Sequence, residues 1–173
     1  MPTQTRDPLP VDASARAVLR HMLATLAYRA AKVLAGTPAD FGATTFGDAT
    51  RRPTRIVAHL ADLMAWGVTL ARGEYVWTAA GGDDWNVEVT RFFDGLAALD
   101  GAIETLADGA VEPLIQGPLA DALTHVGQLA MLRGMAGAPV RPESYARADI
   151  VAGRTGRDQP PPKREFDGDA SAR

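Results

Sequence analysis

Apolar residues recur every three or four positions through four long stretches of the chain, and this spacing is typical of one face of an α-helix. The stretches cover residues 12–34, 53–73, 86–107 and 117–135. Asp12 precedes the first stretch as a candidate N-cap, and a proline suited to the first helical turn begins the second. No stretch of useful length alternates apolar and polar residues as a strand does. The pattern predicts an all-α protein.

Glycine and proline separate the predicted helices. Residues 36–38 end the first helix, residues 108–109 break the third, and residues 117–118, Gly-Pro, are expected to open the fourth. The connection 39–52 is long for two neighbouring antiparallel helices. One interpretation is that this connection crosses the bundle and leaves the first two helices parallel.

Four amphipathic helices of about 20 residues each predict a four-helix bundle. The length of 173 residues fits a single domain. We divide the chain into an N-terminal extension (1–11), the four-helix bundle (12–137) and a tail rich in proline and glycine (138–173). The tail is irregular apart from one short helical candidate at 144–152, and we expect it to pack on the bundle or on a partner.

Composition narrows the classes of function. Hydrophobic residues make up 46% of the chain, as in a folded protein, and the net charge of −3 gives no reason to expect nucleic acid or an anionic membrane as a partner. The absence of cysteine excludes disulfides, cysteine–zinc sites and catalysis by a protein thiol. No apolar run approaches the roughly 20 residues of a membrane helix, and residues 1–8 do not resemble a signal peptide. The expected compartment is the cytoplasm.

Three polar residues fall on the apolar faces of two predicted helices. His59 lies between Ile56 and Leu63, and Asp121 and His125 lie one helical turn apart. Burying an unpaired carboxylate costs several kcal/mol, and one shared metal ion would account for all three residues. Two imidazoles and a carboxylate suit a divalent metal, with Zn or Ni expected ahead of Fe or Mn. Three protein ligands also leave coordination positions open for water or substrate.

The alternative is a polar network without metal. A histidine on an apolar face usually bonds a neighbouring group, and Asp-x-x-x-His occurs often by chance. A buried pair of Asp121 and His125, or a network extending through Gln128 on the same face, would explain the pattern equally well. The third histidine, His21, lies at the edge of the first helix's apolar stripe and is expected to be a boundary residue.

Four further residues are candidates for supporting or substrate-binding roles, namely Asp62, Trp66, Gln128 and Arg133. Asp62 lies one turn from His59 and could orient it, although such a carboxylate is often simply solvated. Trp66 shares that face, while Trp77, in the connection to the third helix, could line a pocket mouth. Arg133 lies two turns beyond His125 and could bind an acidic group, or could be a surface or capping arginine.

The segment 121–139 resembles the last bundle helix of the DinB/YfiT-like superfamily. That helix typically carries a histidine, a second histidine four residues later, and Gly-Gln two residues after it. Here His125 and residues 127–128, Gly-Gln, match the pattern, and Asp121 stands where many members have the first histidine. This departure leaves open which metal is bound and whether the chemistry of the all-histidine members carries over.

The segment 53–62 is similar to the helix that supplies the remaining histidine of that superfamily, here His59. The resemblance covers roughly residues 13–153, including Glu-Ser-Tyr at 143–145. It implies a divalent-metal bundle that is often dimeric. Some relatives transfer low-molecular-weight thiols such as bacillithiol or mycothiol to electrophiles, or isomerise maleylpyruvate with mycothiol. We therefore expect a homodimeric metal-dependent enzyme, a thiol S-transferase acting on a small electrophile.

Two other functions remain open. Metal-bound water could make the protein a hydrolase, with Asp62 or Glu74 as the general base, although neither is compelling. Alternatively, the protein could be a non-catalytic dimeric stress-response or binding module whose metal is structural. A small-molecule substrate is expected in both enzymatic interpretations.

Overall fold

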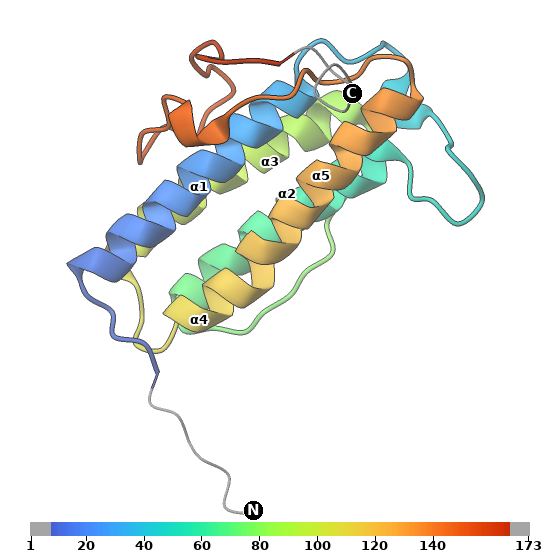
Figure 1. Cartoon of the computed structure of the whole chain (residues 1–173). Helices are drawn as coiled ribbons and strands as arrows, with labels where there is room; N and C mark the ends of the chain where they lie inside the picture. The colour runs from blue at the N-terminus through green and yellow to red at the C-terminus, as the bar shows by residue number, and fades with distance from the viewer. Residues whose placement is uncertain (1–7, 167–173) are drawn as a thin grey trace, which may run out of the picture.

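The computed structural model describes residues 8–166 and folds them into long helices packed side by side (Figure 1). The helices are α1 (Ala13–Leu34), α2 (Pro53–Ala71), α3 (Trp85–Ala102) and a fourth that joins α4 (Val111–Leu114) to α5 (Ala120–Met135) through η3 (Ile115–Leu119). Short 3-10 turns occupy η1 (Phe41–Ala43), η2 (Ile103–Thr105) and η4 (Tyr145–Arg147). No strand occurs within 8–166, so the predicted all-α four-helix class is confirmed. The expectations for the first seven residues and for 167–173 lie outside the described part.

Helix ends follow the local rules that the sequence indicates. The Asp12 carboxylate accepts a hydrogen bond from the Ala15 amide at 2.8 Å and caps α1, as predicted. Asp84 caps α3 in the same way. Pro53 occupies the first turn of α2, where a missing amide hydrogen costs nothing.

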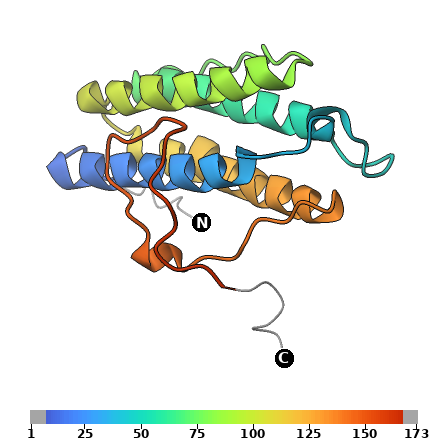
Figure 2. The ribbon, with the colours of Figure 1, turned by 90° about the horizontal axis from the view of Figure 1, so that it is seen from above.

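The helices run in two parallel pairs (Figures 1 and 2). Arg133, near the end of α5, bonds the carbonyl of Val33 near the end of α1, so these helices are parallel. The Ala107 amide, just beyond α3, bonds the Ala71 carbonyl at the end of α2, so this pair is parallel as well. The α1–α5 pair runs opposite to the α2–α3 pair.

The interpretation that the connection 39–52 leaves the first two helices parallel is therefore wrong. This connection folds locally around η1, and the Gly42 carbonyl accepts a hydrogen bond from Thr54 in the first turn of α2. It consequently joins two antiparallel helices that lie diagonally across the bundle, since α1 and α2 each pack mainly on α3 and α5 rather than on one another. The connection 72–84 instead returns along the bundle from the end of α2 to the start of α3 (Figure 1). We call residues 72–84 the crossover loop.

All the long helices contribute to one apolar core. The closest packing joins α2 to α3, where glycine lets the backbones approach. A Cβ on Gly95 would lie 2.8 Å from the Met64 Cβ, and one on Gly67 would lie 2.7 Å from a Leu99 methyl group. Both distances are shorter than van der Waals contact, so this interface depends on the two small residues.

The fourth helix differs from its prediction. It begins at Val111, six residues before the expected start at Gly117, and bends where it was expected to open. Gly117 has φ −89° and ψ −105°, outside helical values, because Pro118 disfavours the helical conformation of the preceding residue. A Cβ on Gly117 would lie 3.0 Å from the Trp66 ring, so the bend also accommodates that indole.

The described part of the C-terminal tail lies against α1 (Figure 2). Buried Glu143 accepts hydrogen bonds from the Tyr28 hydroxyl at 2.6 Å and from Lys32 at 2.8 Å. Burial, reinforced by the bond to Glu143, raises the pKa of Tyr28 well above its ordinary value. The helix expected at 144–152 is reduced to the single turn η4.

Within residues 8–166, no helix combines the length and the apolar character that crossing a membrane requires.

Candidate metal centre

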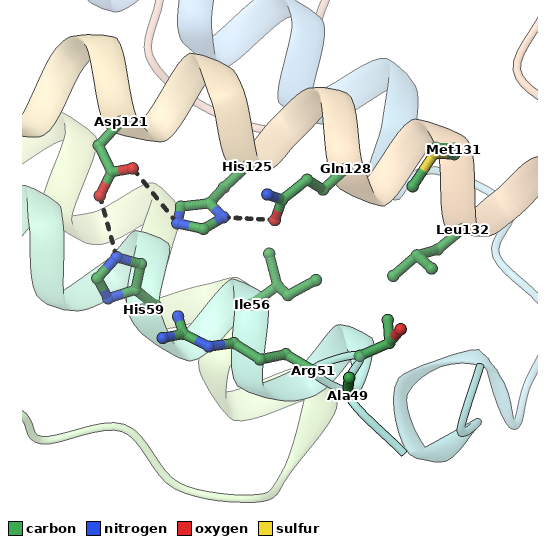
Figure 3. Close-up of a pocket in the computed structure, with 10 residues that line it drawn as sticks. Ala49, Arg51, Ile56, His59, Asp121, His125, Gln128, Met131 and Leu132 are labelled. Atoms are coloured by element: carbon green, nitrogen blue, oxygen red, sulfur yellow. Dashed lines mark hydrogen bonds and ion pairs between the residues drawn. The ribbon is translucent and has the colours of Figure 1, made fainter. Parts of the chain in front are cut away.

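The three residues singled out in the sequence lie together between α2 and α5 (Figure 3). One ligand atom from each of His59, Asp121 and His125 lies within 4.8 Å of the other two. The Asp121 carboxylate lies between the imidazoles, with Oδ2 3.1 Å from Nε2 of His59 and Oδ1 3.4 Å from Nε2 of His125. Side chains 62 residues apart in the sequence thus converge on one point.

The residues face a pocket rather than the core. Exposed fractions are 24% for the His59 side chain, 44% for Asp121 and 12% for His125. The full burial implied by the apolar stripe is therefore wrong, because this edge of the α2–α5 interface opens into a pocket. Small molecules can reach the ligand atoms from that pocket, which a structural metal site does not require.

Gln128 hydrogen-bonds one of the candidate ligands, His125. The Oε1 of Gln128 lies 2.7 Å from Nδ1 of His125. An amide oxygen only accepts, so Nδ1 of His125 is the donor in this bond, and Nε2 of the same ring faces Asp121. Metal-bound histidines are commonly oriented by such a bond from the other ring nitrogen. Gln128 thus contacts the candidate ligand His125 directly.

The donor set fits a divalent cation. Within residues 8–166, the Asp121 carboxylate contacts only the two imidazoles, and no lysine or arginine balances its charge. Two neutral nitrogens and one anionic oxygen, held close together on two rigid helices, are suited to Zn, Ni, Fe or Mn. The same contacts also describe the metal-free polar network.

Two pockets meet at His59. The larger, of about 550 Å³, contains all three candidate ligands and is walled by Ile56 and Leu132, among others. The smaller, of about 390 Å³, extends toward the crossover loop and includes Asp62 and Trp77. His59 and Arg51 line both pockets. Each volume is within the range of small-molecule sites.

The crossover loop covers one side of the site. The Trp77 ring lies 5.7 Å from the His59 ring and 5.8 Å from that of Trp66, measured between centroids. Trp66 itself packs against Gly117 at the bend of the fourth helix. Trp66 thus supports the indole that touches His59 and does not line either pocket itself.

Asp62 has a different role from the one considered in the sequence. It is 5% exposed, and its Oδ1 accepts hydrogen bonds from Arg91 at 2.7 Å and from the Ala80 amide at 3.2 Å. It does not hydrogen-bond His59. Arg91 also bonds buried Glu88, whose other oxygen accepts from the Gly82 amide at 2.7 Å. This buried cluster fixes the crossover loop against α2 and α3.

The sequence analysis did not identify the cluster of Asp62, Glu88 and Arg91. The i,i+3 spacing of Glu88 and Arg91 indicates a local ion pair. Its link to Asp62 depends on the packing of α2 against α3, which no local pattern encodes.

Arg133 lies outside the candidate site. Its guanidinium donates to the carbonyls of Val33, Ala35 and Gly36 and so caps the C-terminus of α1. Desolvation lowers the pKa of this buried group. The capping alternative describes Arg133, whose guanidinium donates to carbonyl oxygens at the end of α1.

No family model, no curated protein and no solved structure matches this chain with significant similarity. The function therefore has to be argued from the site itself.

Proposed function

We propose that the chain is a divalent-metal-binding bundle of the DinB/YfiT-like type, and that it transfers a small-molecule thiol to an electrophile. The observation that carries the proposal is the convergence of His59, Asp121 and His125 at the meeting point of two pockets. The resemblance of the second and fourth helices to that superfamily supports it. The substitution of aspartate for histidine makes the proposed site more anionic than an all-histidine one.

Each residue of the site has a separate proposed role. His59 and His125 would hold the cation through Nε2, and Asp121 would hold it through its carboxylate. Gln128 keeps His125 in the required tautomer. When bound, the cation supplies a charge that favours the thiolate over the thiol, which makes the cosubstrate a nucleophile without a protein cysteine. Trp77 shields one face of His59 from water.

The arrangement favours transfer over hydrolysis. A transferase needs room for two reactants at one centre, and two pockets share His59 here. A hydrolase needs a general base within reach of the attacking water. Asp62 is engaged by Arg91, and Glu74 is exposed and lines neither pocket. No carboxylate other than Asp121 lines the larger pocket within residues 8–166.

The first experiment is to measure metal by elemental mass spectrometry in protein purified without an affinity tag. We expect nearly one equivalent of metal in the native chain and its loss in Asp121→Ala and His125→Ala. His21→Ala is the matched control, because this histidine is exposed on α1, away from the site, and its variant should keep the metal. Gln128→Leu should weaken metal affinity about tenfold to a hundredfold.

Activity is tested next with a panel of low-molecular-weight thiols and a reactive electrophile. Metal-dependent disappearance of both reactants, absent in Asp121→Ala, is the expected result. A native chain that stays empty after Zn, Ni and Mn are supplied would refute the metal site and leave a polar network. Bound metal without turnover of any thiol would instead favour the binding-module alternative.

A further inference from the structure

Arg51 differs from Arg55 and Arg91 because its guanidinium has no hydrogen-bond or ion-pair partner among the described residues. It lies in the connection before α2, and it lines both pockets. Figure 3 shows its guanidinium reaching toward His59. In the part of the chain that the structure describes, Arg51 has no hydrogen bond, ion pair or ring contact. By contrast, Arg55 bonds the crossover loop and Arg91 bonds two buried carboxylates.

The charge balance of the larger pocket makes this cation significant. Arg51 and Asp121 are the only charged side chains among its described lining residues. A divalent cation bound by Asp121 would more than neutralise that carboxylate, so the pocket would carry excess positive charge. Opposite charges in such a partly enclosed space attract more strongly than in bulk water. An anionic ligand is therefore favoured there over a neutral one.

The apolar residues that line the larger pocket indicate that the ligand also has an apolar part. Ile56, Met131 and Leu132 line the same pocket and offer apolar surface next to the guanidinium. A planar guanidinium matches a carboxylate through two parallel hydrogen bonds. An unpaired arginine on open surface needs no ligand, but this one faces a pocket that contains three candidate metal ligands.

We propose that Arg51 binds a carboxylate of the thiol cosubstrate or of the electrophile, so that the site selects small organic acids with an apolar body. The inference rests on the proposed metal centre and names the substrate class for it. Arg51 is thus a specificity-determining residue that lies beside the proposed metal ligands.

The test uses isothermal titration calorimetry on the full chain loaded with metal, with 3-mercaptopropionate and its neutral amide as probes. We expect Arg51→Gln to weaken binding of the acid about tenfold and binding of the amide less than about twofold, in line with loss of a charge-assisted hydrogen bond. Arg52→Gln is the matched control. Arg52 is exposed next to Arg51, bonds Thr45 and lines neither pocket, so its variant should bind both probes normally.

Metal content is measured on the same samples to separate the two proposals. Metal retained in Arg51→Gln with selective loss of acid binding supports the inference. Equal acid binding by native and Arg51→Gln protein overturns it while leaving the metal centre intact, and so does an equal loss in Arg52→Gln. If neither thiol probe binds, the same comparison is made with hexanoate and hexanamide, which lack a thiol. Equal binding of hexanoate by native and Arg51→Gln protein again overturns the inference. A chain without metal overturns both proposals.

Discussion

Replacing Arg91 with methionine would leave two buried carboxylates without their cation. The side chains of Asp62 and Glu88 are 7% and 3% exposed, and Arg91 is 28% exposed. Burial alone would lower the pKa of Arg91, but its hydrogen bonds to the two carboxylates outweigh this effect and raise it. Removing one partner of a buried ion pair costs about 3–5 kcal/mol. Because Arg91 is partly exposed, water can enter the vacated space, and we expect a loss of about 3 kcal/mol.

The assay is urea unfolding followed by circular dichroism at 222 nm, with thermal melts as a second measure. For a chain of this size, about 3 kcal/mol corresponds to a fall in Tm of roughly 6–12 °C. Amide hydrogen exchange should also accelerate at Ala80 and Gly82, because their acceptors Asp62 and Glu88 lose their fixed positions. Amides in the middle of α5 should exchange as before.

Two controls separate loss of charge balance from loss of packing. Arg154→Met breaks a more exposed pair with Asp149, whose side chains are 35% and 44% exposed, and should cost about 1 kcal/mol or less. The triple variant Asp62→Asn, Glu88→Gln, Arg91→Met removes all three charges and should recover more than half of the stability lost in Arg91→Met. A loss below about 1 kcal/mol in Arg91→Met would refute the reasoning, since the pair would then behave as a surface contact.

Two further predictions concern packing and pH. Gly95→Ala should destabilise the fold by about 1–3 kcal/mol, because the new Cβ forces Met64 aside. Gly134→Ala has open space around its Cβ and should stabilise the fold by up to about 1 kcal/mol. Equal effects of the two substitutions in urea unfolding would contradict the packing argument. The unfolding free energy should fall as pH rises above 10.0, the ordinary pKa of tyrosine, because the unfolded chain then loses the proton that Tyr28 keeps when folded. Lys32 acts in the same direction. Burial alone would lower its pKa, but the hydrogen bonds to two carboxylates raise it above 10.5. Its contribution to the unfolding free energy is therefore present below that pH and is lost above it. Tyr28→Phe should reduce the slope between pH 9 and 11, and an unchanged slope would count against the tyrosine's role.

Local chemistry made the helices predictable. Asp12 caps α1 through its own side chain and Pro53 sits in the first turn of α2, so both starts are encoded within a few residues. The convergence of His59 with Asp121 and His125 was also predictable, because each lies on the apolar side of a helix that must face the bundle.

What the sequence did not reveal depends on contacts between distant segments. The direction of α2 follows from the way residues 39–52 fold back on Thr54, and loop length alone does not encode this. Pro118 was taken as a helix start because proline favours that position. Instead, the helix already begins at Val111 and bends at Gly117. The Trp66 ring lies in the space that a Cβ on Gly117 would occupy, and this contact is not visible in the sequence. Arg133 is long enough to reach either a ligand or a helix end, and only the position of α1 decides between them.

The bend at residues 115–119 also sets the rotational register of the candidate ligands. Gly117 leaves helical φ/ψ at this bend, so α5 does not continue the helical phase of α4. Asp121 and His125 face His59 from the helix that follows the bend. Because successive residues of an α-helix are rotated by about 100° around its axis, deleting one residue within 115–119 should turn both candidate ligands relative to α4, although every ligand would still be encoded in the chain.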